Sequence, residues 1–255
     1  MNKILYAVFF ENWRKKVGTC LLMVLFVGCV KNDLRLQSQE DHYISADSTN
    51  VSEKVAYLTF DDGPSKVTEM VLDELKEEKV KATFFLIGEQ ITKEKEPLLQ
   101  RMVKEGHLIG VHTYTHRWKD IYASANAYIE DAEKTAERIY EVTGVKPIYY
   151  RFPWGSVNGY ISSFCDDIIK RMKEKGYTYF DWNVSAEDSV GKPTQESILK
   201  NVRKDYKRYQ EPVILMHDSP SNRLTAETLV QIIREMKDEG YGFSTIQNRS
   251  KPCQY

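Results

Sequence analysis

Residues 55–65 read VAYLTFDDGPS, an apolar run rich in β-branched and aromatic residues that ends in two aspartates and a Gly-Pro pair. Such a run is typical of a buried strand, and the Gly-Pro pair indicates where the strand stops. Similar short runs recur along the chain, each followed by a longer segment with helical periodicity. Regular alternation of strands and helices predicts parallel strands with helices outside them.

The alternation extends to residue 246. Strands are expected at residues 55–60, 83–87, 108–112, 148–152, 178–183, 213–217 and 243–246. Helices are expected at residues 67–79, 97–105, 125–143, 162–175, 194–209 and 225–239. These seven strands favour a barrel or barrel-like α/β fold, with an open doubly wound sheet as the alternative. In both folds the active site lies at the carboxyl ends of the strands.

Charge and hydropathy set the N-terminus apart from the rest of the chain. The 36 basic and 37 acidic residues nearly cancel, which argues against a nucleic-acid partner, because such a partner requires a basic surplus. Residues 1–29 are basic, and their apolar run after residue 16 is shorter than the ~20 residues that span a membrane. This pattern predicts a signal peptide or a single membrane anchor. The run ends in LFVGC, residues 25–29, which resembles a bacterial lipobox with Cys29 as the lipidation site.

The remaining residues divide into a polar segment and one large unit. Residues 30–54 are too poor in large apolar side chains to form a core, so a flexible tether is expected there. Residues 55–250 contain no internal repeat and are expected to form a single catalytic domain, present as a monomer. Cys165 and Cys253 stand in no paired framework, so a disulfide between them is the less favoured outcome.

Titratable side chains follow four of the expected strands at the point where each strand ends. These side chains are Asp61 and Asp62, His112 and His116, Arg151, and His217. Because the carboxyl ends of parallel strands meet at one rim, we expect these groups to lie together. Adjacent aspartates before Gly-Pro are by themselves more often a turn or a helix cap. Titratable groups at all four strand ends, taken together, indicate a functional site.

The same residues indicate a metal. His112 and His116 are four residues apart, so in a helical turn their imidazoles face the same way and can share one ion. Ionising the neighbouring carboxylates of Asp61 and Asp62 together is costly without a cation. One carboxylate and two histidines leave coordination positions open, as water activation requires. We expect a divalent metal, with Zn²⁺ favoured and other divalent transition metals as alternatives.

As a set, these motifs resemble those of polysaccharide deacetylases of the NodB-homology type, carbohydrate esterase family 4. The resemblance covers residues 55–246 and rests on TFDDGPS, HTYTH, RFPWG and LMH. It implies a distorted (β/α) barrel with seven strands. It also implies a hydrolase that uses a divalent metal to remove N-acetyl groups from a polymeric glycan and releases acetate. Together with the expected export segment, it points to peptidoglycan N-acetylglucosamine at the cell surface, with chitin-like oligosaccharide as the alternative substrate.

The resemblance implies a role for each motif residue. Asp61 matches the general base and His217 the general acid, while Asp62, His112 and His116 match the metal ligands. Residues that support the substrate or the transition state are Arg151, Pro153, Trp154, Trp182 and Leu215. Among them, Arg151 orients the base, a backbone N–H near Trp154 holds the oxyanion, and Leu215 lines the acetyl pocket. Trp182 is either a wall of that pocket or an ordinary buried tryptophan.

One segment departs from the family pattern. Residues 181–189 read DWNVSAEDS, so Ser185 stands where an aspartate often pairs with the catalytic histidine, and Ser189 stands where the family has tryptophan. Without that carboxylate the pKa of His217 is expected to be less raised, because an opposite charge favours the imidazolium. Asp188 is a candidate substitute.

Two other functions stay open at this point. The serine at position 185 motivates an inactive glycan-binding homologue that keeps the groove without turnover. Two histidines and a carboxylate also suit Fe(II), as in a non-haem iron oxygenase. The oxygenase, however, offers no use for Asp61 beside Asp62 or for His217.

Overall fold

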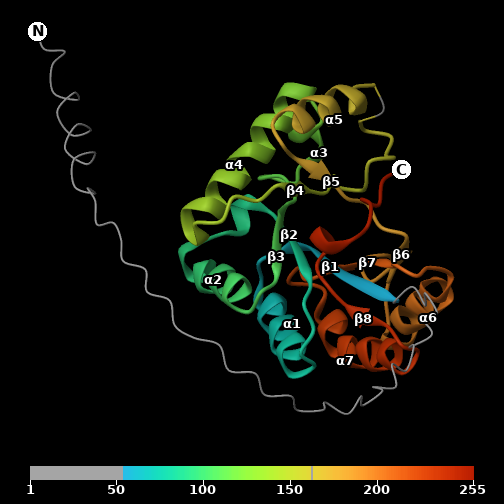
Figure 1. The fold of residues 1–255 in the computed structure, drawn as a ribbon. Coiled ribbons are helices and arrows are strands. Elements are labelled where there is room, and N and C mark those ends of the chain that lie inside the picture. Colours follow the sequence, from blue (N-terminus) through green and yellow to red (C-terminus); the bar gives the residue numbers. More distant parts are fainter. Residues whose placement is uncertain (1–53, 162) are drawn as a thin grey trace, which may run out of the picture. The chain divides into compact units, whose positions relative to one another are not determined.

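The computed structural model describes residues 54–161 and 163–255. The expected export segment, most of the tether and Cys29 lie outside these residues. The described part of the chain forms a parallel sheet with helices around it (Figure 1). No helix in this part is long and apolar enough to cross a membrane.

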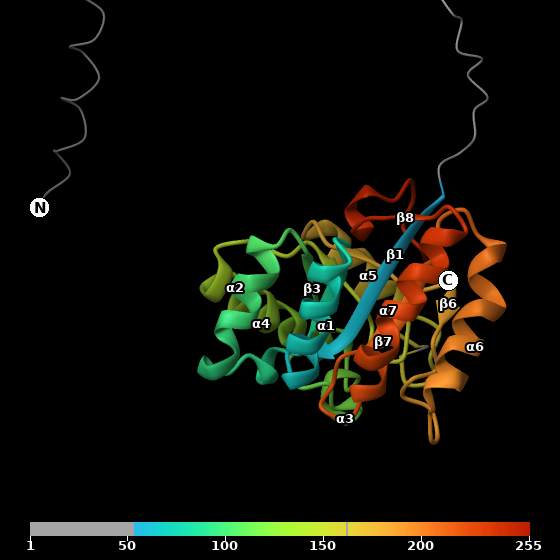
Figure 2. The ribbon, with the colours of Figure 1, turned by 90° about the horizontal axis from the view of Figure 1, so that it is seen from below.

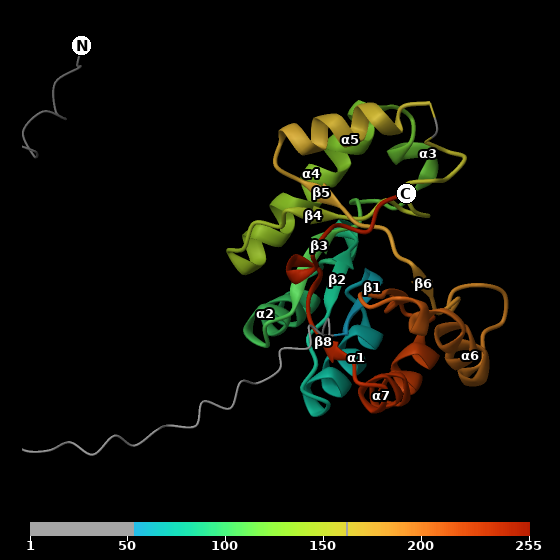
Figure 3. The same cartoon turned by 45° about the vertical axis from the view of Figure 1, so that its right-hand side comes forward.

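The sheet has eight strands, and every pairing between them is parallel. They are β1 (Val55–Gly63), β2 (Thr83–Leu86), β3 (Leu108–Val111), β4 (Tyr149–Tyr150), β5 (Thr178–Tyr179), β6 (Val184–Ser185), β7 (Val213–His217) and β8 (Gly242–Phe243). The order is β5-β4-β3-β2-β1-β7-β6, and β8 pairs with the start of β1. Figure 3 shows β5 and β6 at separate ends of this sheet, where no backbone pairing joins them in the described residues.

This strand order confirms the distorted barrel predicted from the sequence. The strands follow chain order around the sheet, and β7 returns to pair with β1, as in a barrel that has not closed between β5 and β6. The doubly wound alternative is wrong, because in that fold the strand order reverses at a central switch point. Closure on β1 brings the ends of β1 and β7 side by side, with Asp61 opposite His217.

Within residues 54–161 and 163–255, seven α-helices lie outside the sheet, and Figures 1 and 2 show how they surround it. They are α1 (Lys66–Glu77), α2 (Glu96–Lys104), α3 (Trp118–Ile121), α4 (Ala125–Thr143), α5 (Cys165–Glu174), α6 (Gln195–Asp205) and α7 (Arg223–Asp238). The bounds of α4 agree with the prediction because both of its ends are chemically marked. The Ser124 side chain accepts from the backbone N–H of Ala127 at the start, and Gly144, with φ of 70°, ends the helix.

The core lies between the sheet and these helices. Strand β1 is buried on both faces from Ala56 to Phe60, because one face packs against the helices and Tyr57 on the other face belongs to a second apolar cluster. The rings of Phe60 and Phe84 stack with centroids 5.2 Å apart, and helix α1 adds the fully buried Leu72. Burying one such side chain stabilises the fold by about 1.5–3 kcal/mol. The apolar run of residues 55–60 therefore lies at the centre of the core.

Candidate active site

The carboxyl ends of β1, β3, β4 and β7 bring together the residues that were predicted to share one rim. Strand β1 carries two of them, Asp61 and Asp62. In a regular strand neighbouring side chains point to opposite faces. Here the pairing with β2 shifts register between Asp61 and Gly63, and Asp62 has a left-handed backbone with φ of 76°. This bulge allows both carboxylates to serve the same site.

A candidate metal site lies beside Asp61. The Oδ1 atom of Asp62 is 3.5 Å from Nε2 of His112 and 3.5 Å from Nε2 of His116. These three residues form the cluster that can hold a metal ion within the described part of the chain. The same Oδ1 atom is buried and has no hydrogen-bond partner among the described residues. A buried, unpartnered carboxylate oxygen facing two imidazoles fits a divalent cation.

The protonation of His112 suits metal binding. Its Nδ1 lies 2.9 Å from the backbone carbonyl of Arg151. A carbonyl only accepts, so Nδ1 carries the hydrogen and the lone pair of Nε2 is directed to the metal site. Burial lowers the pKa of His112 well below its ordinary value, and the neighbouring His116 lowers it further. His112 is therefore neutral near pH 7, as a metal ligand must be.

The two histidines do not share a helical turn, so that part of the prediction is wrong. The segment from His112 to His116 is an irregular turn in which Thr113 and His116 have φ of 64° and 54°. This backbone brings the two imidazole centroids to 5.0 Å. Asp131 of α4 holds the turn, because its carboxylate accepts from the backbone N–H groups of Tyr114 and Thr115. Sequence reasoning missed Asp131, since it stands on a helix without any motif.

Arg151 connects the proposed base to the rest of the site. Its guanidinium is fully buried and donates to Oδ1 of Asp61 at 2.9 Å and to the hydroxyl of Thr59 at 2.7 Å. Further donation to the carbonyls of Phe180 and Asp181 fixes its plane. Burial raises the pKa of Asp61 to about 6, although the charge of Arg151 works against that rise. A carboxylate with this pKa is ionised at neutral pH and can accept a proton.

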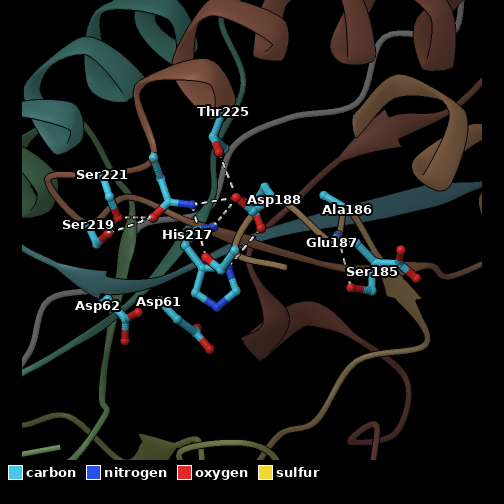
Figure 4. Close-up of polar contacts among 12 residues, drawn as sticks. Asp61, Asp62, Ser185, Ala186, Glu187, Asp188, His217, Ser219, Ser221 and Thr225 are labelled. Atoms are coloured by element: carbon cyan, nitrogen blue, oxygen red, sulfur yellow. Dashed lines mark hydrogen bonds and ion pairs between the residues drawn. The ribbon is translucent and has the colours of Figure 1, made fainter. Parts of the chain in front are cut away.

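His217 has a carboxylate partner, contrary to the expectation drawn from Ser185. Nδ1 of His217 lies 2.8 Å from Oδ1 of Asp188, and the backbone N–H of His217 donates to Oδ2 at 2.7 Å (Figure 4). The hydroxyl of Thr225 also donates to Oδ2, at 2.6 Å. Burial lowers the pKa of His217, but the hydrogen bond and the charge of Asp188 outweigh it and raise the pKa to about 9. The candidate substitute, Asp188, thus lies where a partner is needed.

Ser185 itself takes no part in this pair. Figure 4 shows it away from the His217 ring, and its hydroxyl accepts from the backbone N–H of Glu187 at 3.2 Å. Ser189, in place of the family's tryptophan, accepts from the side chain of Asn222, which also donates to the carbonyl of Asp188. The segment after β6 is therefore held by polar contacts that orient Asp188.

The turn after β4 carries Pro153 and Trp154. Trp154 has φ of 63°, is half exposed, and places its ring centroid 4.9 Å from that of His116. The carbonyl of Pro153 accepts from the hydroxyl of Tyr122 at 2.8 Å. Asp181, fully buried, accepts from the backbone N–H of Ser156 at 2.9 Å and from its hydroxyl at 2.6 Å. This turn is thus fixed from two sides.

The other predicted residues line the surroundings of the base. Leu215 lies on β7 and is buried. The Trp182 ring packs against Gly155, where an added Cβ would meet it at 3.1 Å, and lies 5.6 Å from the guanidinium of Arg151. Cys165 and Cys253 are free thiols, in agreement with the outcome favoured from the sequence.

A parallel barrel whose strand ends carry a candidate metal-binding triad, an arginine-bound carboxylate and a histidine–aspartate pair has a fold and site suited to a hydrolase. The chain belongs to the polysaccharide deacetylase family, whose model matches residues 48–180. This match confirms the family that the motifs resembled and the hydrolase class of the enzyme.

Similar proteins support the same assignment. The chain is 33% identical over 220 residues to a peptidoglycan-N-acetylglucosamine deacetylase of Bacillus cereus. The matched region covers 84% of this chain and 95% of that protein. The catalytic domain of a peptidoglycan N-acetylglucosamine deacetylase from Eubacterium rectale has a TM-score of 0.75 at 31% identity, covering 83% of this chain and 97% of that one. A CE4 esterase of Streptococcus mutans has a TM-score of 0.70 at 31% identity, covering 76% and 86%.

Proposed function

We propose that the protein removes N-acetyl groups from the N-acetylglucosamine of peptidoglycan and releases acetate. The observation that carries the proposal is the pairing of β1 with β7, which puts Asp61 opposite His217 beside the Asp62, His112 and His116 triad. The names of the relatives support peptidoglycan as the substrate. Chitin-like oligosaccharide is the second candidate, because it presents the same acetamido group.

The proposed metal is a divalent ion, Zn²⁺, held by Asp62, His112 and His116. When bound, such an ion polarises the acetamide carbonyl and makes water a stronger nucleophile. Asp61 accepts the proton of the attacking water, while Arg151 keeps Oδ1 of Asp61 in place and leaves Oδ2 to face the site. A backbone N–H near Trp154 stabilises the oxyanion.

Collapse of the tetrahedral intermediate requires a proton on the departing nitrogen. The pKa of His217, about 9, means that its imidazolium is populated at neutral pH. Nδ1–H stays bound to Asp188, so Nε2–H donates to the amine as the C–N bond breaks. Water and amide are thereby converted into acetate and a free amino sugar, with Asp61 having taken one proton and His217 having given one.

The two rival functions are less well supported. The inactive homologue was motivated by a missing partner for His217, and Asp188 supplies that partner. An iron oxygenase uses neither the arginine-bound carboxylate of Asp61 nor a raised histidine pKa. Both groups have a use in amide hydrolysis.

We further propose that residues 1–29 export the protein and attach it to the membrane, with Cys29 as the lipidation site. Residues 30–54 then form a tether. The tether holds the catalytic domain, residues 55–250, at the cell surface as a monomer. A basic start, an apolar run and a polar segment support this organisation. Mass spectrometry of the N-terminal peptide from cells tests it. A peptide beginning at Met1 would contradict lipidation at Cys29.

The test of the enzymatic proposal uses purified peptidoglycan and the zinc-loaded protein. After muramidase digestion, mass spectrometry is expected to show the loss of one acetyl group from each modified N-acetylglucosamine, with matching acetate release. The Asp61→Asn protein serves as the control. Acetyl loss from a different sugar would contradict the substrate, and equal release by the Asp61→Asn protein would contradict the role of Asp61.

A further inference from the structure

Three exposed aromatic side chains form a continuous row that begins at the metal triad. Trp154 lies next to His116, the Tyr160 ring centroid is 5.6 Å from that of Trp154, and the Trp118 centroid is 5.0 Å from that of Tyr160. Their exposed fractions are 47%, 49% and 45%. We call Trp118, Trp154 and Tyr160 the aromatic platform. Exposed apolar surface gathered in one place indicates a binding site more than scattered exposed residues do.

Two further tyrosines, Tyr122 and Tyr128, stack behind Tyr160 and support the aromatic platform. The Tyr160 ring is nearly parallel to that of Tyr122, and the Tyr122 ring lies parallel to that of the fully buried Tyr128 with centroids 5.8 Å apart. The Tyr122 hydroxyl also donates to the carbonyl of Pro153, beside Trp154. These rings are held before any ligand arrives, so binding to them costs little conformational entropy.

At the outer end of the platform, the charge of Arg117 is already paired. Arg117 donates to Glu89 at 2.9 Å and to Asp120 at 2.7 Å. The ammonium of Lys119 lies 5.5 Å from the Trp118 centroid on an exposed side chain, which can move at small cost. A ligand here needs an apolar face for the rings and neutral polar groups at its edge. A pyranose ring has both, since its axial C–H groups meet the negative face of an aromatic ring.

We propose that the aromatic platform binds the sugar rings next to the one whose acetamide lies at the metal triad, with Trp118 and Tyr160 as the outer contacts. The enzyme then acts on glycan chains of several sugars in preference to the free monosaccharide or disaccharide. This inference rests on the proposed function, because it takes an N-acetylated glycan as the ligand. Figure 2 shows α3, which begins at Trp118, on the side of the domain towards which β1 points.

The position of the platform favours a glycan over a membrane surface. Its inner member, Trp154, adjoins a metal ligand, so whatever occupies the platform continues into the site of chemistry. Affinity for anionic lipid requires a cluster of basic residues, whereas Arg117 already has two carboxylate partners and Lys119 is a single cation. Membrane binding therefore becomes an outcome that the experiment can reveal.

The experiment measures binding and turnover of N-acetylglucosamine oligomers from the monomer to the pentamer. Binding is measured by calorimetry in the zinc-loaded Asp61→Asn background, where turnover does not interfere. Trp118→Ala is expected to weaken pentamer binding and to lower kcat/KM on the pentamer by about tenfold, the scale of one aromatic contact. The loss is expected to shrink as the oligomer shortens. Trp118→Phe is expected to restore most of the affinity, and Tyr160→Ala to repeat the effect.

Tyr140→Ala is the matched control, because Tyr140 is an exposed aromatic residue near the opposite end of α4 and outside the platform. Circular dichroism and thermal unfolding establish that each variant is folded. Equal losses at every chain length, or a Trp118→Ala protein that binds the pentamer as the parent does, would overturn the inference. Binding to phosphatidylglycerol vesicles would also overturn the inference, if Trp118→Ala abolishes that binding and leaves pentamer binding unchanged. Pentamer binding through Trp118 without acetate release would instead refute the proposed function alone.

Discussion

At the scale of single residues, the site is organised by groups that hold the reacting groups in place. Arg151 does this twice, since its guanidinium binds the carboxylate of Asp61, the proposed base, and its carbonyl fixes the tautomer of His112. One residue thus connects proton transfer to metal binding. A variant that changes a reacting residue and keeps Arg151 should nevertheless be able to lose proton transfer without losing metal binding.

Asp61→Asn and His112→Ala are expected to separate these functions. The asparagine keeps the shape and the contact with Arg151 but cannot accept a proton, so metal content should stay near one ion per chain while acetate release nearly disappears. His112→Ala removes a ligand from the triad, so metal and activity should fall together. Metal analysis beside an acetate assay checks both variants. A metal-free Asp61→Asn protein would contradict the assignment of Asp61 as base.

The pKa values predict a bell-shaped dependence of kcat/KM on pH. Activity should rise as the pH passes about 6, where Asp61 ionises, and fall as the pH passes about 9, where His217 loses its proton. Asp188→Asn removes the negative charge that favours the imidazolium, so the pKa of His217 falls and the alkaline limit moves to lower pH. Ser185→Ala, the matched control, should leave that limit unchanged. An unshifted limit in the Asp188→Asn protein would mean that another group sets it.

At the scale of secondary structure, one helix holds the metal-binding turn. Asp131 projects from α4 and accepts hydrogen bonds from the backbone of Tyr114 and Thr115, in the turn that carries the triad histidines. Groups that orient metal ligands in this way commonly change metal affinity by 10–100-fold when removed. Asp131→Ala should therefore weaken zinc binding by roughly that factor. Competition with a fluorescent chelator measures the affinity, and Glu130→Ala, an exposed acid on the same helix, is the control.

The elements differ in how far the sequence predicts them. Helix α4 is long, amphipathic and capped at both ends, so its bounds follow from the residues. Strand β6 and helix α3 were not predicted, because they contain two and four residues, only about one period of a strand or a helix, so a hydrophobic pattern cannot repeat within them. The turn from His112 to His116 was misread as helical, since its left-handed residues are set by tertiary contacts.

The site follows a similar rule. Residues at the ends of long strands, such as Asp61 and His217, were predicted because the pattern of the strand fixes where its end lies. Asp188 could only be named as a substitute, because the path of the loop after β6 decides which carboxylate reaches His217. Asp131 and Asp181 act from elements whose own pattern contains no hint of the site.

At the scale of the whole molecule, the last residues complete the barrel on its unpaired side. The carbonyl of Cys253 accepts from the N–H of Asp181 at 2.7 Å, and the side chain of Gln254 donates to the carbonyl of Tyr179 at 3.0 Å. Tyr255 donates through its backbone N–H to the Asp181 carboxylate and through its hydroxyl to the carbonyl of Trp182. The segment 253–255 thus runs beside β5, where the sheet has no further strand.

Deletion of residues 253–255 should lower both stability and turnover. Each lost hydrogen bond costs about 0.5–1.5 kcal/mol, so the loss of the four bonds should lower the free energy of unfolding by roughly 2–6 kcal/mol. Turnover should fall too, because Asp181 also holds the turn that carries Trp154. Urea unfolding and acetate release are the measurements, with Gln254→Ala, which removes a single bond, as the milder control. Unchanged stability would show that the segment is not needed to complete the barrel.

Four non-glycine residues of the site, Asp62, Thr113, His116 and Trp154, have left-handed backbones. Each such residue costs about 1–2 kcal/mol, and the rim is therefore the part of the barrel most ready to relax. A cation that binds only the strained arrangement offsets this cost and stabilises the whole chain in proportion to its occupancy. The melting temperature of this enzyme should therefore rise with the concentration of the divalent metal, and the metal-free protein should be less stable and more open to proteolysis.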